Sequence, residues 1–465
     1  MSTVNAETPP VNTRGRVIVA SLIGTSIEFY DFYVYATAAV LVFPKLFFPS
    51  ADDVTQLLSS FAVFGVAFVA RPLGSILFGH FGDRIGRKGT LIASLLTMGI
   101  ATFLIGCLPT AQVPGWTFLA PALLVVLRFA QGLALGGEWS GAALLATENA
   151  PKNKRAIYGT FPQLGAPIGF IIANTLFLVM NLTLSAEAFS SWGWRIPFLA
   201  SAVMVVIGLY VRLKLVETPA FQKVVEQGQV SRLPLARVFK TSWLQLILGT
   251  FIMLATYVLF YLMTTFTLTF GTTVSSLDAA KAAATKAGKP MTQGAIDAFV
   301  PGLGYSRNDF LLMLIVGVVF FGIFTLVAGP LAERYGRRKS LIVITLGILI
   351  FGLVFAPLAT GGFVGVMLWL IIGFTLMGLT FGPMGAFLPE LFPTNVRYTG
   401  SAVAYNVSSI LGAAVAPFIA VALWQAAKGS TWLVGIYLSS MAVLTLISLF
   451  LSKETKDTDL VEQSV

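Results

Sequence analysis

The stretch Gly79-His-Phe-Gly-Asp-Arg-Ile-Gly-Arg-Lys88 decides the fold, because it joins two apolar segments and recurs once later in the chain. The second copy, Gly329-Pro-Leu-Ala-Glu-Arg-Tyr-Gly-Arg-Arg-Lys339, follows 250 residues later and also separates apolar segments. A second set of residues repeats 242 positions apart and comprises Glu148, Pro151 and Arg155, with Glu390, Pro393 and Arg397. Two recurrences at nearly equal offsets indicate two duplicated halves, which is a known plan for transporters.

The composition requires lipid rather than water around most of the chain. Of 465 residues, 56% are hydrophobic and 11% are charged, and the mean hydropathy is +0.85. Soluble domains carry about 25% charged residues. Apolar stretches near the ~20 residues that a crossing needs lie at 17–42, 57–81, 89–108, 117–145, 157–180, 196–215, 243–270, 309–331, 340–359, 363–389, 398–424 and 432–451. We therefore expect an all-α membrane protein with twelve transmembrane helices in two pseudo-symmetric six-helix bundles.

The charged loops predict the organisation and orientation of this chain. We expect a first bundle over 1–215, a cytoplasmic linker over 216–242, a second bundle over 243–452 and a cytoplasmic tail over 453–465. Loops on the side of the termini hold 21 Lys and Arg residues and the opposite loops hold 7, which predicts both termini in the cytoplasm. The net charge of +10 is thus an orientation signal and not a nucleic-acid surface. An external insert, 271–306, is expected to be a loop, with a short helix over 277–287 as the alternative.

The two copies of the loop motif resemble the hallmark loop of the major facilitator superfamily. The stretches Ile27-Glu-Phe-Tyr-Asp-Phe32 and Arg71-Pro-Leu-Gly74 resemble the metabolite:proton symporter family within it. That family includes carriers for α-ketoglutarate, citrate, shikimate and proline or betaine. The resemblance implies a proton-coupled symporter of the bacterial inner membrane that imports an organic acid or zwitterion by alternating access. The alternatives are a proton-independent facilitator and an outward proton antiporter of the same fold.

An enzyme is a poor interpretation of this sequence. The chain has one histidine, one cysteine and no Walker-type loop, so we expect no catalytic residues, no cofactor and no metal site. The expected partners are a small metabolite, protons and the lipid bilayer, with the chain acting as a monomer and without nucleic acid.

Charged residues inside the predicted spans of the first half are the candidates for coupling. They are Glu28, Asp31, Arg71, Arg128 and Glu138. Each costs at least ~3 kcal/mol at the centre of a membrane, so each needs a partner or a function. The second half has no comparably central charge in its predicted spans.

The resemblance implies that Asp31 in the first span pairs with Arg128 in the fourth, and that this pairing responds to protonation. A permanent structural ion pair is the alternative. Glu28 lies one helical turn before Asp31 on the same face and is expected to share in proton coupling. Arg71 either binds a substrate carboxylate or neutralises Glu28. Three acids against two arginines leave a net charge of −1, which favours a neutral or zwitterionic substrate and admits a monoanion.

Two further groups complete the predicted site. The side chains expected to face the substrate, besides Arg71, are Tyr30, Tyr35, Gln163, Tyr257, Tyr261, Tyr405 and Asn406. The expected gating residues are Asp83, Arg84, Arg87, Glu138, Glu148, Arg155, Glu333, Arg337, Glu390 and Arg397. Within this second group we expect Glu333 to pair with Arg337, and Glu390 with Arg397.

Overall fold

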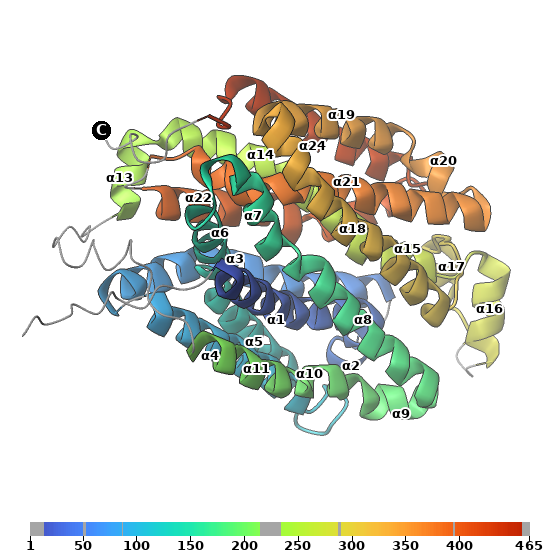
Figure 1. The fold of residues 1–465 in the computed structure, drawn as a ribbon. Helices are drawn as coiled ribbons and strands as arrows, with labels where there is room; N and C mark the ends of the chain where they lie inside the picture. Colours follow the sequence, from blue (N-terminus) through green and yellow to red (C-terminus); the bar gives the residue numbers. More distant parts are fainter. Residues whose placement is uncertain are drawn as a thin grey trace, which may run out of the picture.

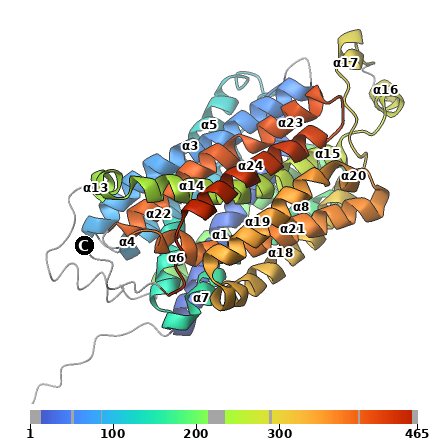
Figure 2. The same ribbon diagram turned by 90° about the horizontal axis from the view of Figure 1, so that it is seen from above.

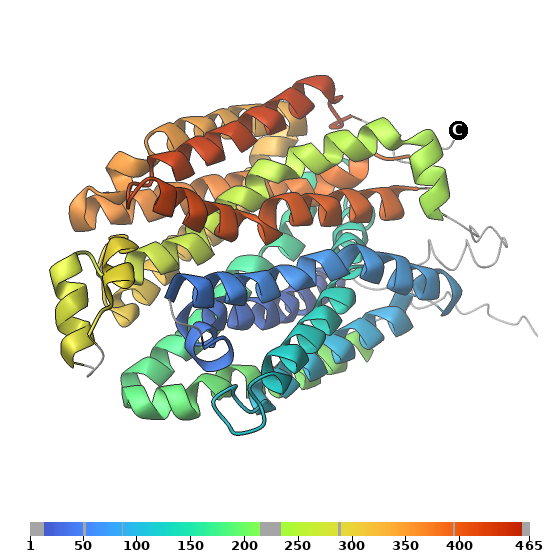
Figure 3. The same cartoon turned by 180° about the vertical axis from the view of Figure 1, so that it is seen from behind.

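Helices account for all the regular secondary structure in the part of the chain that the structure describes. The computed structural model describes residues 14–49, 53–85, 87–213, 234–286, 290–393 and 396–457, and within these ranges it contains no β-strand. The helices of the two halves of the sequence form two groups that lie against each other (Figure 1), and the view from behind shows the same division (Figure 3).

The first half begins at α1, and its helices are named here in chain order. They are α1 (Arg14–Leu41), α2 (Phe43–Phe47), α3 (Asp53–Ile85), α4 (Arg87–Cys107), α5 (Leu119–Leu135), α6 (Glu138–Glu148), α7 (Arg155–Gln163), α8 (Gly165–Thr183), α9 (Ala186–Ser191), α10 (Ile196–Leu199) and α11 (Ser201–Leu213).

The second half follows the linker, of which residues 214–233 lie outside the described ranges. Its helices are α13 (Pro234–Thr241), α14 (Trp243–Tyr261), α15 (Thr267–Thr272), α16 (Leu277–Lys286), α17 (Gln293–Asp297), α18 (Arg307–Tyr335), α19 (Arg337–Leu353), α20 (Phe355–Ala359), α21 (Gly362–Glu390), α22 (Arg397–Ser408), α23 (Ala416–Ala426) and α24 (Trp432–Leu451). Two π-helical turns, η3 (Leu262–Phe266) and η4 (Ser409–Ala414), join α14 to α15 and α22 to α23.

The predicted spans agree with these helices. Among the described residues, nine helices are long and apolar enough to cross a membrane, from Val54–Phe78 to Trp432–Leu451, and each coincides with a predicted span. The remaining three predicted spans correspond to α1, α4 and α19. Of these, α1 carries two acids and α19 begins with three basic residues, which lowers their hydropathy.

The insert differs from the loop that we expected. Its middle forms α16, and α17 follows, so the alternative of a short helix is correct. The alanine-rich sequence of α16 has high intrinsic helix propensity, which explains a helix that buries none of its residues. Figures 1 and 2 place α16 and α17 at one end of the molecule, and α13 at the opposite end. We call these the insert end and the linker end.

Small residues bring α3 and α5 into backbone contact. Gly132 and Gly136 lie four residues apart on α5 and its C-cap, and a Cβ atom on either would collide with the α3 backbone at Ala67 and at Arg71 to Ser75. This is the small-xxx-small packing that membrane helices favour. It brings Arg71 of α3 close to Arg128 of α5.

Candidate functional site

Arg128 is a completely buried cation surrounded by aromatic rings. Its Cζ atom lies 4.0 Å from the centre of the Tyr35 ring, 4.4 Å from that of Phe32 and 5.0 Å from that of Phe64. Its Nη1 donates to Gln131 Oε1 at 2.9 Å. Its Nε and Nη2 have no hydrogen-bond partner among the described residues. The rings attract the guanidinium through their quadrupoles, but they leave two of its donor atoms available.

Asp31 is buried close by, but it does not form the direct ion pair with Arg128 that we expected. Asp31 Oδ1 accepts a hydrogen bond of 2.6 Å from Ser201 Oγ, and Oδ2 has no partner among the described residues. Gln131 Nε2 donates at 2.7 Å to the hydroxyl of Thr102, which also interacts with Asp31. Thr102 and Gln131 thus separate the acid from the arginine in this conformation, which does not show the permanent ion pair, while the pairing that responds to protonation stays a prediction.

Arg71 shares an aromatic ring with Arg128. The Arg71 Cζ atom lies 4.8 Å from the centre of the Phe32 ring and 4.6 Å from that of Phe68. Arg71 also lies within electrostatic range of Glu28, which is itself buried. Two guanidinium groups on one ring form a compact positive region, and α3 and α5 contribute one group each.

Arg212 is a buried charge that sequence reasoning missed, because it was counted with the basic residues of the linker. Arg212 lies near the end of α11 with 5% of its surface exposed, and it forms an ion pair with Glu138 of α6. Ser94 also donates to Glu138, at 3.2 Å. Among the described residues of the first half, the buried charges are therefore three acids and three arginines, so the net charge of −1 that we expected becomes zero.

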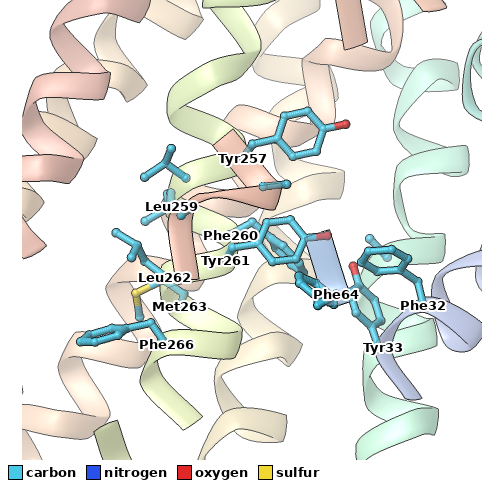
Figure 4. Packing of buried hydrophobic residues seen from close by; sticks show 14 of the residues in the cluster. Phe32, Tyr33, Phe64, Tyr257, Leu259, Phe260, Tyr261, Leu262, Met263 and Phe266 are labelled. Atoms are coloured by element: carbon cyan, nitrogen blue, oxygen red, sulfur yellow. The ribbon is translucent and has the colours of Figure 1, made fainter. Parts of the chain in front are cut away.

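The second half meets this charged cluster with tyrosines, and its described residues place no buried charged side chain in mid-helix. Figure 4 shows Tyr257 and Tyr261 on one face of α14, and of the two it is Tyr261 that lies beside Phe64 of the first half. The Tyr261 ring packs edge-on against Phe64 at 5.7 Å and Phe68 at 5.5 Å. Both tyrosines interact electrostatically with Arg71. The two tyrosines share one side of α14, and that side faces the arginines, while their contact with a substrate stays a prediction.

Other predicted substrate contacts are occupied by protein partners in this structure. Tyr30 donates to the Pro197 carbonyl of α10, and Tyr35 covers Arg128. Tyr405 stacks on Trp139 with ring centres 4.0 Å apart, and its ring lies 5.3 Å from that of Tyr257. These contacts hold the residues in place without requiring a substrate.

Gln163 and Asn406 connect the two halves. Gln163 accepts from Trp139 Nε1 at 2.8 Å and donates to the Phe381 carbonyl at 3.0 Å. Asn406 donates to Ser75 Oγ at 2.6 Å and to the Gly136 carbonyl at 2.9 Å.

Tyr398 adds a further bridge between the halves, since it donates to the Gly137 carbonyl at 2.6 Å. Near the break between α5 and α6, neutral hydrogen bonds from Asn406 and Tyr398 thus connect the two halves.

The predicted gating residues of the second half form a buried network at the linker end. Arg337 is completely buried and pairs with Glu333 Oε1 at 3.1 Å and with Glu390 Oε2 at 3.4 Å. The pair of Glu333 and Arg337 is as expected, whereas the partner expected for Glu390 was Arg397. Arg397 Nε donates to the Phe392 carbonyl at 3.2 Å. Across the interface, Glu333 Oε2 accepts from the Ala156 amide at 2.8 Å.

The tail also contributes to this network, which the sequence analysis did not anticipate. Glu454 accepts from the backbone amides of Arg337 at 2.8 Å and Arg338 at 3.1 Å, and so caps the N-terminus of α19. Thr455 donates to Glu390 at 2.6 Å. The polar tail has no hydrophobic periodicity that would predict a packed segment. The sequence signal for this contact was the Glu454-Thr455 pair shortly after the last span.

Some predicted gating residues have side chains outside the described part of the structure. They are Asp83, Arg84, Arg87 and Glu148. Arg155 begins α7 and lies within electrostatic range of Glu390. Within the described ranges, no group of three or more His, Cys, Asp or Glu side chains is arranged to hold a metal ion.

Comparisons with known proteins agree with this arrangement. A family profile described as "Sugar (and other) transporter" matches residues 16–242 and 299–465. The Inner membrane metabolite transport protein YhjE of Escherichia coli K12 is 54% identical over 97% of this chain and 96% of its own length. The Shikimate transporter of the same strain is 34% identical over 95% of each chain. The Proline/betaine transporter of that strain is 30% identical over 95% of this chain and 83% of its own length.

A solved structure supports the fold. The proton:xylose symporter XylE bound to 6-bromo-6-deoxy-D-glucose superimposes with a TM-score of 0.71 over 97% of this chain and 98% of that chain. The two sequences are 17% identical, so this likeness concerns the fold alone.

Proposed function

The chain belongs to the sugar (and other) transporter family of the major facilitator superfamily, and from this premise we propose that it is a proton-coupled symporter. It is a multi-pass membrane transporter and not an enzyme. In our proposal it imports a small polar metabolite, an organic acid or a zwitterion, by alternating access. The coupling groups are Asp31, Arg128 and Glu28.

One observation carries this proposal: Asp31 and Arg128 are buried together without touching. Asp31 Oδ1 accepts a hydrogen bond from Ser201, while Oδ2 has no hydrogen-bond partner among the described residues. Arg128 has two donor atoms without acceptors among the same residues. A buried carboxylate needs a cation or a proton, and a buried guanidinium needs an acceptor. Both groups are therefore incompletely satisfied, which is the condition that proton or substrate binding relieves.

The chemistry of coupling follows from the intervening polar side chains. When Asp31 carries a proton, it is neutral and needs no cation. When it loses the proton, its charge attracts Arg128, and the path between them runs through Thr102 and Gln131. A carrier that alternates between these arrangements releases its proton on one side of the membrane, because the two conformations differ in their affinity for it.

Charge counting narrows the substrate. The three acids and three arginines of the first half sum to zero, so one bound proton leaves one positive charge. A monocarboxylate then restores neutrality, and Arg71 is positioned to bind it bidentately. A zwitterion also fits, because its carboxylate binds Arg71 while its cation faces the tyrosine rings. We propose Tyr257 and Tyr261 as the second-half contacts of this substrate.

We also propose an inner-membrane location, both termini in the cytoplasm and a monomeric state. Support for the orientation comes from the excess of Lys and Arg in the loops of the linker side. The linker end then faces the cytoplasm, and the network of Glu333, Arg337 and Glu390 acts as the cytoplasmic gate.

The test uses purified protein in liposomes with an imposed inward proton gradient. Labelled shikimate, proline and glycine betaine are the first probes, since they are named for relatives of this chain. We expect at least one of them, or another monocarboxylate, to accumulate only with the gradient. Asp31→Asn is expected to abolish accumulation and retain exchange of internal for external substrate.

Other outcomes identify the rival functions. Uptake that is unaffected by collapse of the gradient indicates a facilitator. Faster efflux with the inward gradient indicates an antiporter. Full accumulation by Asp31→Asn would show that the coupling assignment is wrong.

A further inference from the structure

Besides Arg71, the ion pair of Arg212 and Glu138 also lies near Glu28 of α1. Arg212 of α11 reaches Glu138 of α6 by passing over Gly24 of α1. A Cβ atom at Gly24 would lie 3.3 Å from Arg212 Nη2 and 3.9 Å from Glu138 Oε1. The missing side chain at Gly24 therefore leaves room for this ion pair to cross α1.

Glu28 points toward the same place. It lies four residues after Gly24, and side chains on an α-helix lean toward the N-terminus, so a residue covers the position one turn before it. Cβ atoms at this spacing are about 5–6 Å apart. The Glu28 side chain thus extends along the gap that Gly24 leaves, toward the Arg212 guanidinium. The two groups interact electrostatically, and Glu28 Oε2 has no hydrogen-bond partner among the described residues.

A small cavity adjoins this cluster. It has a volume of about 30 Å³ and is lined by Ser21, Gly24, Thr25, Glu138 and Arg212, among others. Its volume exceeds the roughly 10–15 Å³ that a water molecule needs, and polar side chains of Ser21, Thr25, Glu138 and Arg212 lie at its wall. The ion pair therefore has space beside it into which the Arg212 and Glu138 side chains can shift.

The groups around Glu28 come from several elements. Those that interact electrostatically with it are Arg71 of α3, Arg212 of α11, Tyr33 of α1 and Tyr405 of α22. Glu138 of α6 reaches it through Arg212. Helix α7 also packs on α1 and carries Arg155 and Tyr158, whereas α8 carries no titratable side chain. Arg212 is the member of this set that forms an ion pair with a second acid, Glu138.

We propose that Arg212 and Glu138 form a release switch for a proton on Glu28. Glu138 holds Arg212 away while Glu28 is protonated, and Arg212 moves through the Gly24 gap to Glu28 when the proton leaves. The exchange keeps the number of ion pairs constant: the proton of Glu28 leaves the cluster, Glu28 pairs with Arg212, and Glu138 remains as a carboxylate beside the cavity. This rests on the proposed proton coupling and assigns Arg212 as a positioning residue within it.

The test measures protonation of Glu28 directly and needs no substrate. The full-length chain in liposomes is titrated by infrared difference spectroscopy, and the carboxylic acid C=O band that disappears in Glu28→Gln identifies Glu28. We expect Glu138→Gln to release Arg212 to Glu28, so that the proton concentration at which the band is half formed rises tenfold or more. Arg212→Gln is expected to have the opposite effect, with the band forming at a tenfold or more lower proton concentration.

Two substitutions at Gly24 test whether Arg212 must pass through the gap to reach Glu28, because they change the volume of the gap and not its charge. Gly24→Leu changes no charge but fills the gap, so in the Glu138→Gln background it should return the titration to within threefold of wild type. Gly24→Ala adds only a methyl group and should preserve most of the shift in that background. These variants also suffice if Arg212→Gln does not fold.

The switch is refuted if the two charge variants shift the band in the same direction, or if neither shifts it threefold. It is equally refuted if Gly24→Leu leaves the Glu138→Gln shift intact, or if wild type shows no Glu28 band. Failure of the proposed function looks different, because gradient-driven uptake is then absent from wild-type liposomes whatever the band does.

Discussion

The two halves of the molecule bury their charges in different places. In the first half, Glu28, Asp31, Arg71 and Arg128 lie in the interior of helices, whereas Glu138 begins α6 and Arg212 is next to the last residue of α11. In the described second half, the buried charges are Arg337, Glu390 and Arg397, and each is the first or last residue of its helix. Charge at a helix end at the membrane surface costs little, whereas charge in mid-span costs at least ~3 kcal/mol. Among the described residues, charges buried in mid-helix therefore belong to the first half, and the proton-responsive groups that we propose lie there.

Substitution of Arg128 should give the largest effect if this division is correct. Arg128→Lys replaces a planar group that stacks on three rings with a strongly hydrated point charge. Breaking a buried charge arrangement costs about 3 kcal/mol, or about 100-fold. We expect proton-driven accumulation in liposomes to fall by that factor. The matched control is Arg338→Lys in the second half, where the arginine donates to two carbonyls at the linker end. An equal loss in the control would break the comparison.

The next effect concerns Arg71. Arg71→Lys removes bidentate binding of a carboxylate, and a hydrogen bond to a charged group contributes about 1.5–3 kcal/mol. We therefore expect the KM for a transported monocarboxylate to rise tenfold or more, with kcat reduced much less. Initial uptake rates over a range of substrate concentrations give both values. An unchanged KM would make Arg71 a structural arginine that serves Glu28.

A substitution at Tyr261 tests whether the second half contributes to substrate affinity without contributing to coupling. Tyr261→Phe keeps the ring that packs on Phe64 and Phe68 but removes a hydroxyl worth about 0.5–1.5 kcal/mol as a hydrogen-bond donor. We expect a KM increase of a few-fold, while the accumulation ratio at a fixed proton gradient stays that of wild type. Tyr437→Phe on α24 is the matched control and should change neither value. A lower accumulation ratio in Tyr261→Phe would place coupling in both halves.

The smallest effect is expected from the tail. Glu454→Gln weakens the cap on α19, at a cost of about 1 kcal/mol, or roughly fivefold in the opening of the linker end. The opening is measured as the alkylation rate of the Ser140→Cys variant in a Cys107→Ser background, which removes the native thiol. Ser140 contacts Ser401 across the two halves. We expect alkylation to quicken by that factor, whereas Asp457→Asn in the same segment should leave the rate unchanged. Equal alkylation rates in Glu454→Gln and Asp457→Asn would show that the tail does not contribute to the gate.

The fold and the mid-span charges were predictable because both leave strong signals in sequence. Apolar stretches of membrane length and a duplicated loop motif identify two six-helix halves, and Asp31 or Arg128 stands out in an apolar background. Thr102 and Gln131 do not, since neutral polar residues are common in spans, and so a direct ion pair was expected where a relay exists. Arg212 was missed for another reason: a basic residue next to a basic linker looks like an orientation signal.

The tail and the insert show the limits of local patterns. Glu454 acts on α19 across more than 100 residues of sequence, and only tertiary structure brings them together. The insert has no hydrophobic periodicity, yet its alanine-rich run forms α16 through intrinsic propensity alone.

The bonds from Asn406 and Tyr398 to the carbonyls of Gly136 and Gly137 have a consequence for how such a protein changes over generations. Every amino acid has the same main-chain carbonyl, so no replacement at either glycine alters the acceptor itself. Close contact with α3 additionally excludes any side chain at Gly136. Heritable adjustment of this contact therefore falls to Asn406 and Tyr398 of the second half, the half in which we propose Tyr257 and Tyr261 as substrate contacts. Selection for a new substrate and selection for a new opening rate would then act on the same half of the gene.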